Sequence, residues 1–219
     1  MTNSQRGIIS IPIEILQGCR KETINDLMKI VNNGYHKQVT KYNIVQTPRI
    51  HHSTTFFSDL GLDIPKCHLY MMIEGIDSVT LGLVPQGTVG SYPLYEINEI
   101  AKFKFDEKNV LSTLAYRPLP QKKYPDSYEI TGFTSFGKGC GLETFNSTLS
   151  HFQKMRSDCK KLVIKVIVEH ELVSYYEQKL GFVEFDRILQ KKSELKDSGF
   201  EDSFMVSQDF HVSSMERVL

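Results

Sequence analysis

Several common signals are absent from this chain of 219 residues. It contains no tryptophan, and its 26 basic residues are balanced by 26 acidic residues, so the formal net charge is zero. Proteins that bind nucleic acid or an anionic membrane surface through charge normally carry a basic excess. The balanced charge therefore argues against nucleic acid or a membrane as the main partner.

Cysteines are also few. The four present, Cys19, Cys67, Cys140 and Cys159, form no C-x-x-C pair, so neither a zinc ribbon nor a dithiol redox site is indicated. The first ten residues lack the apolar core of a secretory signal, and no apolar run is long enough to span a bilayer. We therefore expect reduced thiols, no metal site, no membrane association and a cytoplasmic location, with the nucleus as an alternative.

The composition that remains is ordinary for a globular protein. Apolar residues make up 40% of the chain and charged residues 24%, and neither internal repeats nor low-complexity linkers occur. A chain of this length can bury one sizeable core. We expect a single domain over residues 1–219, with an irregular insert at about 75–108 that glycine and proline interrupt repeatedly.

Hydrophobic periodicity predicts several elements in the N-terminal half. A partly alternating run at 8–16 indicates an edge strand, because Pro12 fits an edge better than the centre of a sheet. Apolar spacing predicts an amphipathic helix at Lys21–Tyr35, which Asn33-Gly34 should end. The remaining predictions are a short helix at 51–62 and strands at 68–73 and 109–116.

The C-terminal half predicts the order strand, helix, strand, helix, strand, strand. A strand at 128–134 precedes a helix at 142–156, whose apolar stripe consists of Leu142, Phe145, Leu149 and Phe152. The dense β-branched run at 162–168 indicates a central strand. A helix at 172–180, a strand at 182–186, a polar loop at 191–202 and a last strand at 204–210 complete the prediction.

A glycine-rich turn follows the strand at 128–134. Gly137, Gly139 and Gly141 alternate with Lys138 and Cys140 before the helix. Glycines let successive backbone N–H groups converge on one anion, and the helix adds the positive end of its dipole. The spacing matches neither the P-loop nor the dinucleotide fingerprint. A ligand-free turn remains the alternative, and Cys140 lacks the nearby histidine that a Cys–His nucleophile would need.

A second segment, Tyr176-Glu177-Gln178-Lys179-Leu180-Gly181-Phe182, indicates which anion the turn would hold. The turn Phe136-Gly137-Lys138-Gly139-Cys140-Gly141 and this tyrosine phrase, in this order and separation, resemble the GCN5-related N-acetyltransferase superfamily. The resemblance covers residues 126–186. It implies a mixed, mostly antiparallel sheet, flanked by helices and splayed at the site where acetyl-CoA enters.

The resemblance also implies roles for individual residues. Gly137, Lys138, Gly139, Cys140 and Gly141 would bind the pyrophosphate of acetyl-CoA. Ile130, Thr131 and Phe133 would pair with the pantetheine arm, and a backbone N–H there would polarise the thioester carbonyl.

Tyr176 would donate a proton to the departing thiolate, a role that suits a phenol with an ordinary pKa near about 10. Glu129 is the first candidate for a general base, and its alternative role is a solvated carboxylate on a strand. Asp126, Glu169 or a chain of water molecules could serve instead.

Two departures from the pattern leave a second hypothesis open. Phe136 stands where the superfamily carries Arg or Gln, and Glu169 stands where many members carry Asn. The main hypothesis is an acetyl-CoA-dependent N-acetyltransferase acting on a primary amine, either a small molecule or a peptide, by direct attack in a ternary complex. The alternatives are a non-catalytic CoA-binding or protein-interaction module and a nucleotide-dependent enzyme; assembly as a homodimer is left open.

Overall fold

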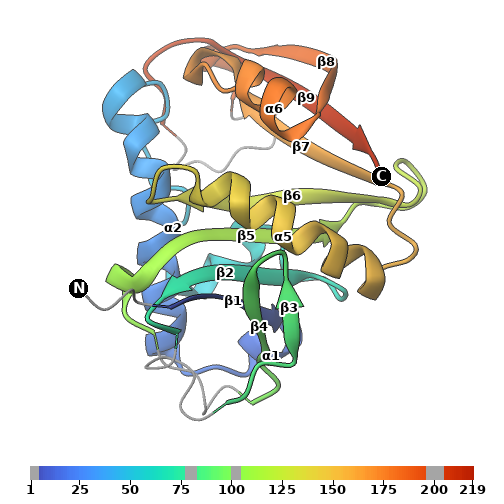
Figure 1. Ribbon diagram of the computed structural model, residues 1–219. Helices are drawn as coiled ribbons and strands as arrows, with labels where there is room; N and C mark the ends of the chain where they lie inside the picture. Colours follow the sequence, from blue (N-terminus) through green and yellow to red (C-terminus); the bar gives the residue numbers. More distant parts are fainter. Residues whose placement is uncertain (1–4, 77–82, 100–104, 196–204) are drawn as a thin grey trace.

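The computed structural model describes residues 5–76, 83–99, 105–195 and 205–219, and these form one mixed sheet flanked by helices (Figure 1). The nine strands lie in the order β3-β4-β1-β2-β5-β6-β7-β9-β8. Their bounds are β1 Arg6–Pro12, β2 His68–Glu74, β3 Gly87–Val89, β4 Tyr92–Glu96, β5 Val110–Pro118, β6 Ser127–Ser135, β7 Lys161–Ile167, β8 Val183–Gln190 and β9 Phe210–Val218. Among the strand pairs of the described residues, only β1–β4 and β6–β7 are parallel, which confirms the predicted mixed, mostly antiparallel sheet.

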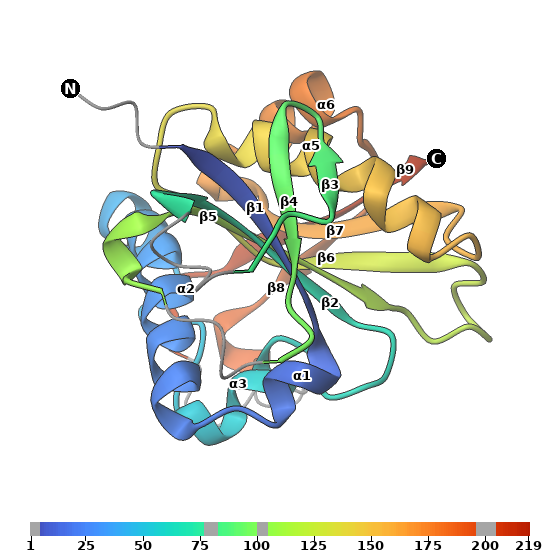
Figure 2. The same cartoon turned by 60° about the horizontal axis from the view of Figure 1, so that its bottom comes forward.

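Helices cover both faces of this sheet (Figures 1 and 2). One apolar cluster joins α1 (Ile13–Gln17), α2 (Lys21–Tyr42) and α3 (Phe56–Asp59) to β1 and β2. A second cluster lies under α5 (Cys140–Met155) and α6 (Val173–Leu180). The stripe predicted for α5 is correct, since Phe145 and Phe152 are fully buried in this second cluster.

Short 3₁₀ turns connect several of these elements. They are η1 Ser53–Thr55, η3 Glu107–Asn109, η4 Val168–His170 and η5 Lys192–Glu194. The strands predicted at 68–73, 109–116, 128–134 and 162–168 and the helices predicted at 142–156 and 172–180 are all confirmed within two residues.

Three predictions for the N-terminal half are wrong. The strand predicted at 8–16 ends at Pro12, and the residues that follow form the helix α1. β1 is an interior strand, because β4 pairs with it in parallel on the side opposite β2. Pro12 is tolerated because the β4 pairing covers only Ile8–Ser10. The helix does not end at Asn33-Gly34 but continues to Tyr42, where Asn43 adopts a left-handed conformation.

Part of the predicted insert at 75–108 belongs to the sheet. β3 and β4 form a hairpin that extends it beyond β1, while residues 77–82 and 100–104 lie outside the described residues. The last strand was predicted at 204–210 but runs over Phe210–Val218, because its apolar residues pair there with both β7 and β8. Much of the loop predicted at 191–202 lies outside the described residues, although η5 falls within it.

Within the described part of the chain, no helix combines the length and apolarity needed to cross a bilayer. The same residues hold no group of three or more His, Cys, Asp or Glu side chains placed to bind a metal ion. All four cysteines are free thiols.

Candidate functional site

Strands β6 and β7 separate along their length, and this separation organises the site. They pair only over three residues, from Ser127 with Lys161 to Glu129 with Val163, and the described residues show no further pairing between them. Beyond this point β6 stays paired with β5, whereas β7 pairs with β9. Backbone groups on the two facing edges therefore lack strand partners, so an extended ligand could pair with them.

A bulge lies in β6 beside this separation. Gly132 and Phe133 together oppose a single residue of β5, Leu114. Gly132 has φ 57°, a left-handed conformation that glycine adopts at little cost. Because a bulge leaves its extra residue outside the ladder, this is the part of β6 where a backbone N–H can reach a ligand.

The β6 residues expected along the cofactor arm are divided between two faces. Ile130 is 3% exposed and packs in the cluster under α5 and α6, whereas alternation places Thr131 on the face that α2 covers. The bulge returns Phe133 to the α5 side, where its ring lies 6.4 Å from that of Tyr176. Cys140 is buried in the same cluster, which favours a packing role for its side chain.

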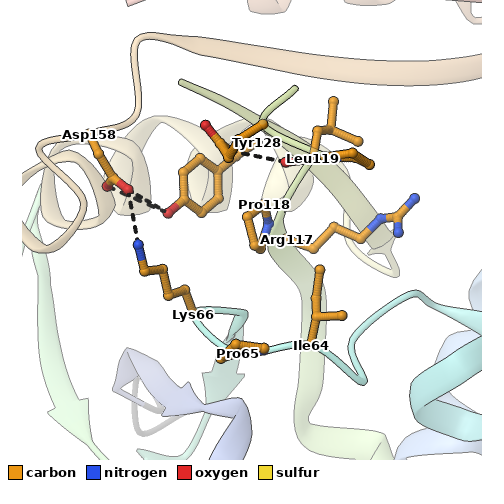
Figure 3. A pocket seen from close by; sticks show the side chains of 10 residues that line it. Ile64, Pro65, Lys66, Arg117, Pro118, Leu119, Tyr128 and Asp158 are labelled. Carbon is orange, nitrogen blue, oxygen red and sulfur yellow. Dashed lines mark hydrogen bonds and ion pairs between the residues drawn. The ribbon is translucent and has the colours of Figure 1, made fainter. Parts of the chain in front are cut away.

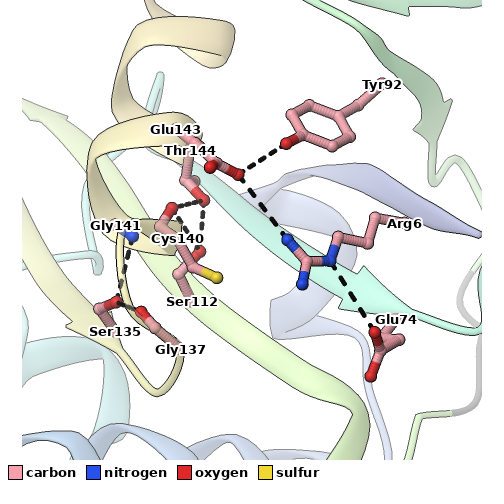
Figure 4. Close-up of polar contacts among 10 residues, drawn as sticks. All are labelled: Arg6, Glu74, Tyr92, Ser112, Ser135, Gly137, Cys140, Gly141, Glu143 and Thr144. Atoms are coloured by element: carbon pink, nitrogen blue, oxygen red, sulfur yellow. Dashed lines mark hydrogen bonds and ion pairs between the residues drawn. The ribbon is translucent and has the colours of Figure 1, made fainter.

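The glycine turn between β6 and α5 is held by internal hydrogen bonds (Figure 4). The Ser135 hydroxyl donates to the Gly137 carbonyl at 2.9 Å and accepts from the Gly141 amide at 3.1 Å. The Cys140 amide donates to the same Gly137 carbonyl at 3.2 Å. Gly139 precedes the helix with φ 81°, so an L side chain there would be strained.

Four amides of the turn region remain open. Those of Gly137, Lys138, Gly139 and Leu142 donate no hydrogen bond to any described residue. They lie at the N-terminus of a 16-residue helix, whose dipole favours negative charge there. An anion at the turn would therefore meet these four amides, whereas the amides of Cys140 and Gly141 are used inside the turn.

Glu143, in the first turn of α5, is the nearest fixed negative charge described on this helix end. The Tyr92 hydroxyl donates to it at 2.6 Å, and the Arg6 guanidinium lies 3.9 Å from the same carboxylate and 3.8 Å from Glu74 (Figure 4). These partners partly offset the repulsion between Glu143 and an incoming anion. Tyr92 begins β4, so the hairpin in the predicted insert lies beside α5 and the glycine turn.

A lysine from α2 reaches the turn from elsewhere in the sequence. The Nζ of Lys37 donates to the Ser135 carbonyl at 2.9 Å and lies 5.2 Å from the centre of the Phe136 ring. Phe136 itself packs against the apolar cluster that includes α2. The turn thus has a second cation beside Lys138, supplied by a helix about one hundred residues earlier.

Tyr176 lies on α6 among aromatic rings. Its ring centre is 5.6 Å from that of Tyr175 and 6.2 Å from that of Phe182, and its exposed fraction is only 9%. Burial, with the Tyr35 and Tyr175 hydroxyls nearby, raises the pKa of Tyr176 well above its ordinary value. The phenol is therefore protonated at neutral pH, and no side chain among the described residues forms a hydrogen bond with its hydroxyl.

The three carboxylates considered as bases differ in their surroundings. Glu129 is 8% exposed and forms an ion pair with Arg117 at 2.6 Å. Burial alone would raise the pKa of Glu169, but hydrogen bonds from the ring and backbone amide of His211 outweigh burial and lower it. Asp126 is exposed in a turn with φ 54°. Glu129 is thus the most enclosed of the three, and its carboxylate already has a cationic partner.

A pocket of about 600 Å³ lies at the opposite end of β6 from the glycine turn (Figure 3). Lys66 lies 3.5 Å from Asp158, and the Tyr128 hydroxyl donates to Asp158 at 3.3 Å. Burial, reinforced by the charge of Asp158, raises the pKa of Tyr128 to about 12. Neither the turn nor Tyr176 lines this pocket, so it is separate from the site described above.

Comparison with known families identifies the sequence family. The model of the sporulation protein RMD6 family matches residues 1–219. The chain belongs to this family. Sporulation protein RMD6 of Saccharomyces cerevisiae is 36% identical over 228 residues, which cover 97% of this chain and 95% of that protein.

The fold of this RMD6-family chain is similar to that of solved acetyltransferases. Spermidine N-acetyltransferase from Vibrio cholerae, in complex with CoA and spermine, matches with a TM-score of 0.53 and 11% identity over 98% of this chain and 95% of that one. N-acetyltransferase from Staphylococcus aureus Mu50 matches with a TM-score of 0.52 and 12% identity, over 98% of this chain and 99% of that one. Ribosomal-protein-alanine N-acetyltransferase from Brucella melitensis matches with a TM-score of 0.51 and 11% identity, over 92% of this chain and 97% of that one. At these identities the likeness shows the fold.

The sequence of this RMD6-family chain did not predict three residues that lie beside the site. Lys37 lies beyond Tyr35, the predicted end of the helix, so the sequence predicts no helical position for it. Tyr35 and Arg117 carry no local motif, and only packing brings them near Tyr176 and Glu129. A longer helical period through Val39 would have placed Lys37 on α2, but nothing local shows that it meets the turn.

Proposed function

We propose that this RMD6-family protein binds acetyl-CoA between β6 and β7 and transfers the acetyl group to a primary amine. The observation that carries the proposal is the unpartnered, protonated hydroxyl of Tyr176, whose ring lies beside Phe133 at the bulge of β6. The open amides of Lys138, Gly139 and Leu142 supply an anion site just beyond the end of the same strand, a few residues after the bulge. These three features match the parts of a phosphate-bearing thioester: the strand edge suits its extended arm, Tyr176 its sulfur and the anion site its phosphates.

The proposed reaction is direct attack. The neutral amine nitrogen bonds to the thioester carbonyl carbon while a backbone N–H at the bulge hydrogen-bonds to the carbonyl oxygen. The C–S bond then breaks, and Tyr176 gives its proton to the departing sulfur. The new amide loses a proton to Glu129 or to water. The raised pKa keeps the phenol protonated before the reaction, and the same shift makes Tyr176 a weaker acid toward the departing thiolate than an ordinary phenol.

Calorimetry and turnover test the two parts of this proposal separately. We expect CoA and acetyl-CoA to bind, and Tyr176→Phe to lower the rate of acetyl transfer by about 10²-fold or more while CoA affinity changes little, because only proton donation is lost. Tyr175→Phe, on the neighbouring and half-buried ring, is the matched control and should retain the wild-type rate. Absence of CoA binding by the wild-type chain would end the proposal.

A non-catalytic CoA-binding or protein-interaction module is the second candidate function. The ion pair of Glu129 with Arg117 favours it, because the carboxylate first considered as a base is already engaged. In that case CoA would bind, no amine would be acetylated, and Tyr176→Phe would change nothing.

Two fold neighbours are named for spermidine and for ribosomal-protein alanine. Polyamines and peptide N-termini are therefore the first amines to screen, together with protein lysines.

A further inference from the structure

Helix α2 and strand β6 approach each other unusually closely at one glycine. A Cβ at Gly34 would overlap the side chain of Thr134, so only glycine permits this separation of the two backbones. Lys37 lies three residues further along α2, on the same side of the helix. The close approach therefore brings its ammonium group to Ser135 and Phe136, at the start of the glycine turn.

The position of Lys37 complements the turn chemically. Phe136 is apolar and packed against the α2 cluster, so it offers an anion no hydrogen bond. The Nζ of Lys37 lies over this same ring, and an ammonium group has three donors, of which the described residues use one, at the Ser135 carbonyl. Its side chain is exposed, so the remaining donors are accessible to a ligand at the turn.

We propose that Lys37 binds the diphosphate group of coenzyme A, in place of a polar side chain at position 136. This inference rests on the proposed function, since it takes coenzyme A as the ligand at the turn. Lys37 then acts as a point charge beside the diphosphate, whose other oxygens accept from the open amides of Lys138 and Gly139. α2 thereby becomes part of the cofactor site.

The test measures the Kd of coenzyme A, 3′-dephospho-CoA and pantetheine for the full chain and its variants. Lys37→Gln retains a donor for the Ser135 carbonyl but removes the charge. We expect it to weaken coenzyme A and 3′-dephospho-CoA binding alike, by about fivefold to tenfold, because a charge-assisted contact is lost. Pantetheine, which has no phosphate, should bind the variant and the wild type equally. Raising the salt concentration should reduce the difference.

Lys29→Ala is the matched control, because Lys29 lies on the same helix and pairs with Asp26. It should bind all three ligands as the wild type does, and Lys37→Arg should recover most of the lost affinity. Equal affinity of Lys37→Gln and wild type for coenzyme A would overturn the role of Lys37. So would a loss confined to coenzyme A, which would point to the 3′-phosphate, or an equal loss for pantetheine. Failure of the wild type to bind coenzyme A would instead overturn the proposed function, and this inference with it.

Discussion

At the residue scale, His68 shows how burial fixes a protonation state away from the candidate site. Its Nε2 lies 2.6 Å from the Ser10 hydroxyl in the interior of the sheet. Burial, with the charges of His151 and Arg156 as smaller causes, lowers the pKa of His68 to about 3. The imidazole is therefore neutral in the folded protein throughout the physiological range.

This neutrality predicts acid sensitivity. In the unfolded chain His68 has a pKa near about 6.5, so between pH 6.5 and 3 the unfolded state binds a proton that the folded state does not. The free energy of unfolding should accordingly fall as the pH drops through this window, by roughly 5 kcal/mol in total from this residue. Urea denaturation at a series of pH values measures this.

Two variants isolate the contribution of His68. His68→Gln, which keeps a donor toward Ser10, should show a shallower pH dependence, while the exposed His52→Gln should keep the wild-type slope. Some slope will remain, because burial also lowers the pKa of His170. If the slopes of the wild type and His68→Gln coincided, His68 would not be the buried neutral group described.

At the scale of elements, hydrophobic periodicity correctly predicted the strands and helices whose burial follows from their local sequence. The β-branched run of β7 and the apolar stripe of α5 are local signals of burial, and both were located correctly. The end of α2 was predicted wrongly, because Asn33-Gly34 ends a helix only where no tertiary contact requires the glycine. Here Gly34 is required by the close approach to Thr134, and the packing of α2 outweighs its low helix propensity.

The contact at Gly34 predicts an unusual response to alanine. In an exposed helix Gly→Ala stabilises by about 0.5–1 kcal/mol. At position 34 we expect a net destabilisation of roughly 1–2 kcal/mol, because the new methyl group overlaps the Thr134 side chain and separates α2 from β6. Urea denaturation measures the difference.

Asn33→Ala is the control for helix propensity, because Asn33 is exposed on the same turn of α2. It should be neutral or slightly stabilising. A Gly34→Ala protein as stable as the wild type would mean that the two elements are less tightly packed than described. The Gly34→Ala variant should also bind coenzyme A more weakly, because the displacement of α2 moves Lys37 away from the glycine turn.

At the scale of the whole molecule, the candidate site joins segments that are far apart in the chain. Lys37 comes from α2 and Phe133 from β6. The glycine turn links β6 to the start of α5, and Tyr176 comes from α6. A ligand that contacts all of them should stabilise the fold as a unit. We propose that residues 1–219 unfold as a single domain, so that one thermal transition reports the effect.

Coenzyme A should therefore raise the melting temperature. At about 100 times its Kd a ligand contributes about 2.7 kcal/mol, which for a chain of this size corresponds to roughly 5–10 °C. NAD and ATP at the same concentration should give much smaller shifts. A larger shift with NAD or ATP would instead favour the nucleotide-dependent enzyme considered from the sequence.

The sequence by itself determined the order of the C-terminal elements, the glycine turn and the position of Tyr176 within its phrase. These features depend on local propensity, periodicity and spacing, and each of these signals comes from residues that are close together in the sequence. Only the tertiary structure decided that β1 is interior, that Glu129 is bound to Arg117, and that Lys37 meets the turn. Each of those facts depends on contacts between segments distant in sequence, which no local pattern encodes.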